Sequence, residues 1–254
     1  MNNFIKHYPV YYINIDSRTD RNDYILDHFK DNNILNFNKI SACTPDQIPD
    51  RLIEDAKVLG LNKKELATVF SHLKAMEYFI TNSNEKYALI CEDDVDLENI
   101  KKMEFSVDQL FDVFKLKVEC VQLSVCTRED IPANFKIRLR SFWDFCCGAY
   151  LVTREYAEKI ISYYKENDYF NLKKYKKNTV LEYRNGKTFL TPPVAECVVY
   201  EMTDTFVCPI ATFIFTESSI DSSDEKNRQI IKSNNDFYSF WSKYKTIRLV
   251  DLIA

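Results

Sequence analysis

Residues 87–96 read YALICEDDVD, and this stretch decides the fold we expect. Its first five residues are apolar, a run that is short for a helix and typical of a strand inside a sheet. Four carboxylates then follow within five positions: Glu92, Asp93, Asp94 and Asp96. In open α/β sheets, ligands bind beyond the carboxyl ends of the strands, so these side chains lie where a ligand is expected.

The spacing of these carboxylates favours a bound cation. Carboxylates this close together repel one another unless a cation or a basic group neutralises them. Oxygen ligands suit Mg²⁺ or Mn²⁺, which also bind the phosphates of a substrate. The stretch therefore predicts a site for a metal ion and a diphosphate at the strand end. An acidic turn on the protein surface is the alternative interpretation.

Strands and helices alternate on both sides of this stretch. We expect strands over residues 10–15, near 39–41, over 118–125 and over 149–152, and helices around 24–29, over 62–80 and over 154–164. The best-marked helix begins at Asn62, which can cap it while Glu65 completes a capping box. This alternation predicts an α/β fold with a mostly parallel central sheet flanked by helices. The length suits one domain spanning 1–254.

Basic residues follow the first predicted strand. Arg18 and Arg21 lie at the same sheet edge as the acidic stretch if the two strands are parallel, and there they can hold phosphate or ribose. Surface salt bridges are the alternative for both arginines. His72 lies beside the apolar stripe of the helix over 62–80, where it is either a satisfied core residue or a functional one.

The composition argues against several classes of protein. A net charge of −4, with both signs mixed along the chain, argues against a dedicated nucleic-acid binder. With only three glycines the chain has no Gly-rich phosphate loop, so a metal ion is the expected means of holding a nucleotide. No apolar stretch is long enough for a membrane span, and residues 1–7 lack a signal-peptide core. We therefore expect a cytoplasmic protein whose eight cysteines are free thiols, mostly buried.

Four segments carry a family resemblance. Residues 12–21, YINIDSRTDR, resemble the opening INLDRRxDR of glycosyltransferase family 25, the family of lipooligosaccharide and collagen galactosyltransferases. Residues 71–76, SHLKAM, are similar to its SHxxxW helix, ALICEDDV at 88–95 to its ALILEDDV, and GAYLVTR at 148–154 to its GxxAYLIS. Residues 218–223 weakly resemble its late Ser/Asp-rich segment.

The resemblance implies a GT-A-type fold, a nucleotide-sugar donor (UDP-galactose in the best-known members), Mn²⁺, and inversion at the anomeric carbon. It places Asp16 and Arg18 near the nucleotide and makes Glu92 and Asp94 the outer acids of a D-x-D-like element that binds metal and diphosphate. We therefore expect a hexosyltransferase that moves galactose or glucose to a hydroxyl group of a glycan or protein. The expected site consists of Asp16, Arg18, Arg21, Ser71, His72 and Glu92 around the cofactor, Asp94, Glu92 and Asp96 on Mn²⁺ or Mg²⁺, and Asp93 with Glu196 in catalysis.

The general base is sought in the second half of the chain, because the first half is committed to donor and metal. Glu196 is an acid within the apolar run VAECVVY at 194–200, and partial burial there favours a base. A helix-surface glutamate is the alternative interpretation. Asp144 and Asp221 are the other candidates for the base.

The chain ends in an aromatic segment, FYSFWSKY at 237–244. On a helix from about 235, Phe237, Phe240, Trp241 and Tyr244 share one face. We expect this face to dock on the domain. A homodimer contact or a shelf for the acceptor is the alternative.

Two other functions stay open. A metal-dependent nucleotidyltransferase can use a similar acidic strand end, but it typically opens with a Gly-rich loop, and this chain opens with residues 14–18, NIDSR. A non-catalytic module that binds sugar or nucleotide is the second. Such a module would be a transferase that has lost its activity, and the retention of Glu92, Asp93 and Asp94 together argues against that loss.

Overall fold

In the computed structural model the apolar run at 87–91 forms β3 (Tyr87–Glu92), a buried strand, as predicted. The structure describes residues 3–5, 7–113, 118–127, 136–141, 144–175, 182–184, 187–189, 193–200, 202–213 and 225–253. The strands are β1 (Val10–Asn14), β2 (Phe37–Ser41), β3, β4 (Val95–Asp96), β5 (Cys120–Ser124), β6 (Cys126–Thr127), β7 (Arg138–Leu139), β8 (Asp144–Phe145), β9 (Ala149–Thr153), β10 (Lys165–Glu166), β11 (Tyr169–Phe170), β12 (Glu182–Arg184), β13 (Lys187–Phe189) and β14 (Thr205–Phe213). The α-helices are α1 (Thr19–Asp31), α2 (Asp50–Val58), α3 (Lys63–Asn82), α4 (Val107–Val113), α5 (Arg154–Tyr164), α6 (Ala195–Tyr200), α7 (Glu225–Trp241) and α8 (Leu249–Ile253).

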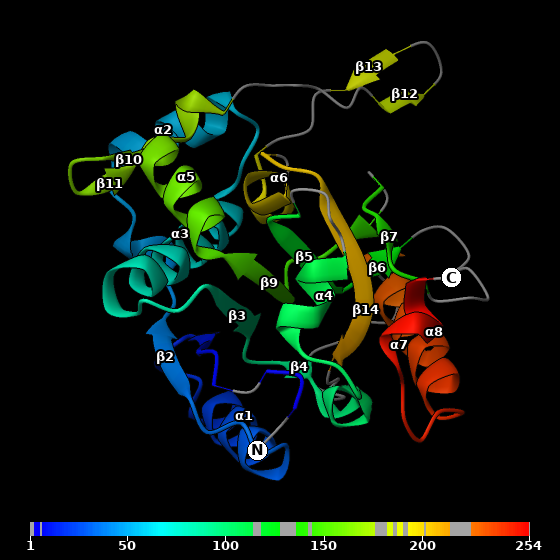
Figure 1. Cartoon of the computed structure of the whole chain (residues 1–254). Coiled ribbons are helices and arrows are strands. Elements are labelled where there is room, and N and C mark those ends of the chain that lie inside the picture. The colour runs from blue at the N-terminus through cyan, green and yellow to red at the C-terminus, as the bar shows by residue number, and fades with distance from the viewer. Residues whose placement is uncertain are drawn as a thin grey trace.

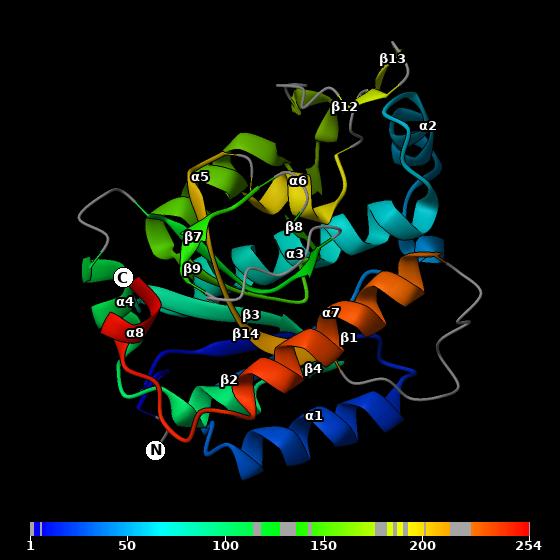
Figure 2. The same ribbon diagram turned by 90° about the vertical axis from the view of Figure 1, so that its right-hand side faces the viewer.

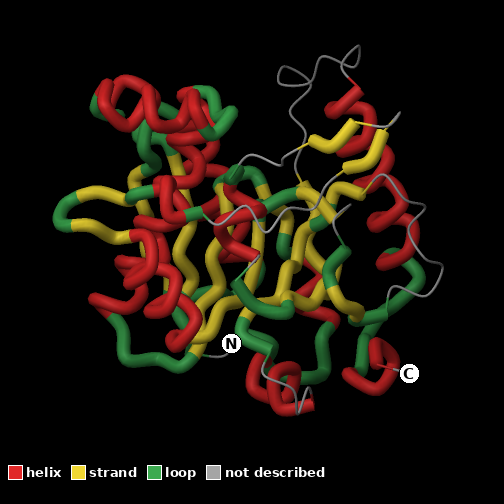
Figure 3. The backbone as a smooth tube through the Cα atoms, turned by 90° about the horizontal axis from the view of Figure 1, so that it is seen from above, coloured by secondary structure: helices red, strands yellow, loops and turns green. Residues whose placement is uncertain are grey.

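The central sheet has the strand order β2-β1-β3-β9-β5-β14-β4, with β7 also paired to β14. β1 is parallel to both β2 and β3, and β14 is parallel to β5. β9 lies antiparallel between β3 and β5, so the five other long strands all run in one direction. The predicted mostly parallel sheet is confirmed. Seen from above, its strands lie side by side across the molecule with helices around them (Figure 3).

Helices cover both faces of the sheet, as Figures 1 and 2 show. One core cluster joins alternate β1 residues Val10 and Tyr12 to α1, α4 and α7. The other joins Tyr11 and Ile13 to α2, α3, α5 and α6. Because side chains alternate across a strand, β1 contributes to both cores and is buried throughout. The α/β fold with flanking helices is therefore the one that the sequence predicts.

α3 begins where its capping signal predicts. Asn62 Oδ1 accepts hydrogen bonds from the backbone amides of Lys64 (2.9 Å) and Glu65 (3.0 Å), and Glu65 Oε2 accepts one from the Asn62 amide (2.8 Å). The apolar stripe of α3 then packs against the sheet, which brings His72 to Glu92 at the end of β3 and Ser71 to the backbone of Cys43.

α7 begins at Glu225, earlier than the residue near 235 expected from the aromatic spacing. Phe237 and Trp241 are buried against the sheet, and Trp241 Nε1 donates to the Pro209 carbonyl in β14 (2.9 Å). Tyr244, beyond the helix, is exposed. All eight cysteines are free, as predicted. Among the described helices, none combines the length and apolarity that a membrane crossing needs.

Candidate active site

Two side chains tie the acidic turn after β3 to the end of β1. Asn14, the last residue of β1, is 1% exposed and donates through Nδ2 to Asp93 Oδ2 (2.7 Å). Arg21 on α1 donates through Nη1 to Asp93 Oδ1 (3.1 Å) and to Asp94 Oδ2 (3.0 Å). Because β1 and β3 are parallel neighbours, their carboxyl ends bring these residues to one edge of the sheet. We call Asn14, Arg21, Asp93 and Asp94 the strand-end cluster.

One oxygen of Asp94 has no partner among the described residues. Oδ1 is buried, and no described residue forms a hydrogen bond with it. Burial, followed by the negative charge of Glu92, raises the pKa of Asp94 to about 7, and Arg21 opposes this effect. An unsatisfied buried acceptor costs free energy unless a donor or a cation reaches it. The carboxylate oxygens of the cluster, and above all the unpartnered Oδ1 of Asp94, therefore suit a bound cation.

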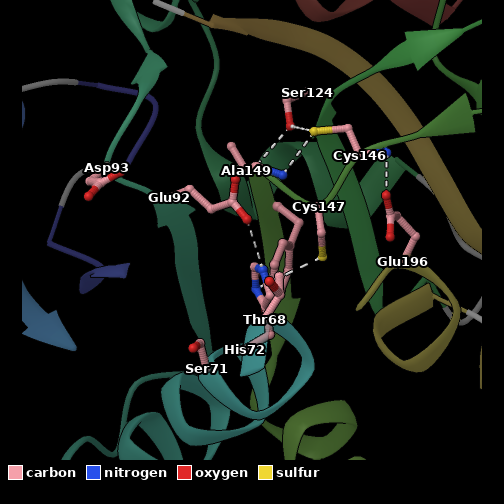
Figure 4. Close-up of polar contacts among 12 residues, drawn as sticks. Thr68, Ser71, His72, Glu92, Asp93, Ser124, Cys146, Cys147, Ala149 and Glu196 are labelled. Atoms are coloured by element: carbon pink, nitrogen blue, oxygen red, sulfur yellow. Dashed lines mark hydrogen bonds and ion pairs between the residues drawn. The ribbon is translucent and has the colours of Figure 1, made fainter. Parts of the chain in front are cut away.

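Glu92 faces α3 instead of the cluster (Figure 4). Its Oε1 lies 3.3 Å from His72 Nε2, and the other ring nitrogen, Nδ1, lies 3.3 Å from the Tyr150 hydroxyl. The side chain of His72 is 1% exposed, whereas that of Glu92 is 30% exposed. His72 therefore contacts Glu92 directly, while Glu92 is the member of the pair that solvent can reach.

Asp96 is directed away from Asp94. Its Oδ2 accepts a hydrogen bond from the Tyr238 hydroxyl on α7 (2.9 Å), and its Oδ1 accepts one from the Glu98 amide (2.7 Å). His28 Nε2 on α1 lies 3.6 Å from the same carboxylate. The structure does not bring Asp96 together with Glu92 and Asp94 as predicted, because β4 pairs with β14 and turns Asp96 toward α7. Across the described ranges, no three His, Cys, Asp or Glu side chains gather into a metal site.

The remaining predicted cofactor residues occupy two kinds of environment. Asp16 is exposed. Its hydrogen bonds with Lys39, which has the larger effect, and with Ser41 lower the pKa of its carboxylate. Arg18 is partly exposed and makes a bidentate pair with Asp20 (2.8 and 2.7 Å).

Ser71, by contrast, is buried, and its hydroxyl accepts a hydrogen bond from the Cys43 amide (2.9 Å) and donates one to the Ala67 carbonyl (2.8 Å). Asp16 and Arg18 are therefore open to a ligand in this structure, whereas the Ser71 hydroxyl is occupied by the backbone.

Glu196 lies on α6, across the segment 146–148 from Glu92 (Figure 4). Its Oε1 accepts a hydrogen bond from the backbone amide of Cys146 (3.1 Å). Asp144, the second candidate for the base, is fully buried in a bidentate pair with Arg138 (2.5 Å for both bonds). A carboxylate held in this way has no free oxygen that faces solvent. Asp221 and the segment 218–223 lie outside the described residues.

Two buried side chains were not predicted: Asn14 in the strand-end cluster, and Gln122, which donates to the backbone carbonyls of Phe145 and Cys146 beside Glu196. Both are buried polar side chains in strands that are otherwise almost entirely apolar. Such residues are hydrogen-bonded in nearly all proteins, so each marks a buried polar contact. That exception to the apolar pattern was the signal in the sequence, but it does not reveal the partner.

Comparison with protein families identifies one that matches this chain. A model of glycosyltransferase family 25 (LPS biosynthesis protein) matches residues 7–175, more than half of the chain. No curated protein matches the chain.

Solved structures are similar at low identity. A crystal structure of a protein from STIV shares 12% identity, with 83% of this chain and 87% of that chain covered and a TM-score of 0.44. The inositol-1-phosphate CTP transferase from T. maritima shares 12% identity, with 91% and 98% covered and a TM-score of 0.41. A glycosyltransferase involved in glycosylation of the major capsid of PBCV-1 shares 12%, with 89% and 98% covered and a TM-score of 0.34. These similarities are too weak to support a conclusion about function.

Proposed function

The chain belongs to glycosyltransferase family 25, and we propose that it transfers a hexose from a UDP-linked donor to a hydroxyl group of a glycan or protein, with inversion at the anomeric carbon. The observed α/β sheet agrees with the GT-A-type fold that this membership implies. The observation that carries the proposal is the strand-end cluster, where a buried oxygen of Asp94, beside Arg21, has no partner in the part of the chain that the structure describes.

The strand-end cluster suits the diphosphate of the donor. Arg21 supplies a guanidinium, which matches phosphate oxygens well, at the carboxyl ends of two parallel strands. Asn14 donates to Asp93, and Asp93 in turn accepts a hydrogen bond from the Arg21 guanidinium. Asp93 therefore acts by positioning Arg21. Asp16, which is exposed, and Arg18, which is partly exposed, follow β1 and are available for the nucleotide.

A divalent cation fits the same place. Mg²⁺ and Mn²⁺ commonly use one or two carboxylates together with substrate phosphates, so a third protein ligand is not required. Asp94 would hold the ion through its free oxygen, and Glu92, which is partly exposed, is the second candidate ligand. The bound ion would stabilise the negative charge of the departing nucleoside diphosphate.

Glu196 is the proposed general base. In an inverting transfer, a base removes the proton from the acceptor hydroxyl as the hydroxyl oxygen attacks the anomeric carbon and the bond to the diphosphate breaks. Glu196 supports this role because it is partly exposed and one of its oxygens is oriented by the Cys146 amide. Its second oxygen is then the one that we assign to the acceptor.

A donor screen that measures released nucleoside diphosphate tests the proposal. We expect slow release of UDP from one UDP-sugar in the presence of Mn²⁺. We expect Asp94→Asn and Glu196→Gln each to lower the transfer rate by about 10²-fold or more, while Asp23→Asn, an exposed acid on the same helix as Arg21, serves as the control. Preference for a nucleoside triphosphate would point to a nucleotidyltransferase. Binding of UDP without turnover would point to a non-catalytic module.

A further inference from the structure

The segment from Cys146 to Gly148 has an uncommon backbone. Cys146 has a φ of 94° although it is not glycine. A side chain makes this conformation unfavourable, so it persists only where the surroundings hold it. Residues of this kind cluster at functional sites. The contacts that Cys146 makes with its surroundings are therefore informative.

Gln122 is the main contact that holds the segment. It lies on β5 and is fully buried. The two hydrogens of its Nε2 are shared among the carbonyls of Ser124 (3.0 Å), Phe145 (3.1 Å) and Cys146 (2.9 Å). These carbonyls accept hydrogen bonds only, so they determine which end of the Gln122 amide is the nitrogen. The Tyr200 hydroxyl donates to the Cys146 carbonyl as well (3.3 Å).

The same segment contacts the carboxylate of Glu196 and the backbone of Glu92 (Figure 4 shows the Glu196 contact). On one side, the Cys146 amide donates to Glu196 Oε1 (3.1 Å). On the other side, the Gly148 carbonyl accepts a hydrogen bond from the Glu92 amide (2.7 Å). The segment therefore joins the proposed base to the strand that carries the acidic turn.

We propose that Gln122 is a positioning residue for sugar transfer, because its hold on the Phe145 and Cys146 carbonyls orients the Cys146 amide toward Glu196. This proposal rests on Glu196 as the base in the proposed function. The Phe145 carbonyl and the Cys146 amide belong to one planar peptide group, so the bond from Gln122 to that carbonyl fixes the direction of the amide. Gln122 does not touch Glu196 and acts only through this backbone.

The test compares Gln122→Leu, Glu196→Gln and the double variant. Gln122→Leu should lower kcat by about 10- to 100-fold, the size of effect seen when a catalytic group is displaced by about 1 Å. The KM for the UDP-sugar should change by less than about twofold, since binding at the strand-end cluster is not altered. In the Glu196→Gln background, Gln122→Leu should cause no further loss, because the group that it positions is already absent.

Two further variants separate this role from a structural one. Asn99→Leu removes another buried amide that donates to a backbone carbonyl, that of Ile210 (3.2 Å), and should leave kcat per folded molecule unchanged. Tyr200→Phe keeps the ring and removes the second donor to Cys146, so it should lower kcat in the same direction but by less. This variant carries the test if Gln122→Leu does not fold.

Three results would overturn the proposal. The first is an unchanged kcat in Gln122→Leu, or in Tyr200→Phe where that variant carries the test. The second is an equal loss from that variant with and without the Glu196 carboxylate, which would reject positioning through Glu196 while leaving the base in place. The third is a wild-type rate in Glu196→Gln alone, which would reject the proposed base itself. The single variant Glu196→Gln thus distinguishes a failure of the proposed function from a failure of the inference.

Discussion

Asp94 is held in the folded protein at an electrostatic cost, so Asp94→Asn should stabilise the metal-free protein. The Asp94 side chain is 26% exposed, and its Oδ1 has no partner among the described residues. Its pKa is raised from 3.8 to about 7, first by burial and then by Glu92. The ionised carboxylate therefore favours the unfolded chain, in which water solvates it.

The magnitude follows from this pKa. A rise from 3.8 to about 7 is roughly three units, which at about 1.4 kcal/mol per unit corresponds to at most about 4 kcal/mol. This net shift already includes the opposing charge of Arg21, and solvent at the 26% exposed side chain screens part of the cost. We therefore expect a net stabilisation of about 2 kcal/mol. Because the folded-state pKa is raised, the native protein retains a proton that the unfolded chain has lost, so wild-type stability falls as pH rises from about 4 to about 7.

Urea denaturation in the presence of a chelator, at several pH values between 5 and 8, measures this effect. The advantage of Asp94→Asn should be small at pH 5, grow toward pH 7 and then level off. Asp23→Asn, which removes an exposed acid, should show no such growth. A variant that is less stable than the wild type at pH 8, or an advantage that does not change with pH, would refute the reasoning.

Three changes of stability follow from contacts outside the cluster, each measured by urea or thermal denaturation. Asn62→Ala removes the side-chain acceptor of the α3 capping box and leaves the backbone amide that donates to Glu65, and it should cost about 1 kcal/mol; an unchanged midpoint would contradict this. Gly148→Ala should cost about 1–3 kcal/mol, because the added Cβ lies 2.6 Å from Phe213 Cε1, and a neutral result would mean that the ring moves freely. Trp241→Ala should cost about 3–5 kcal/mol, since the side chain is buried and donates to Pro209; a loss below about 1 kcal/mol would show that α7 contributes little to the fold.

The parts of the fold that sequence predicts well are those with local causes. The helix 154–164 was predicted with the bounds that α5 has, and Thr153 caps it through its side chain (3.1 Å to the Tyr156 amide). Asn62 and Glu65 likewise lie within one turn of each other. Apolar runs predicted β1 and β3 because a strand buried on both faces has no polar alternation.

The remainder depends on pairing between distant segments. The antiparallel direction of β9 between β3 and β5 has no local signal in the sequence, since a buried strand has the same apolar pattern whether it is parallel or antiparallel to its neighbours. The helix α2 was not predicted at all. The direction of Asp96 follows from β4 pairing with β14, more than one hundred residues away. Sequence therefore located the acidic turn but not which of its carboxylates share a partner.

The central claim is that the strand-end cluster holds the donor diphosphate with a divalent cation, and calorimetric titration of UDP tests it most directly. The wild type should bind UDP more tightly with Mn²⁺ than with a chelator. Asp94→Asn should abolish that difference, and the control Asp23→Asn should retain it. Equal UDP affinity in the wild type with and without Mn²⁺, or an unchanged Mn²⁺ effect in Asp94→Asn, would contradict the account.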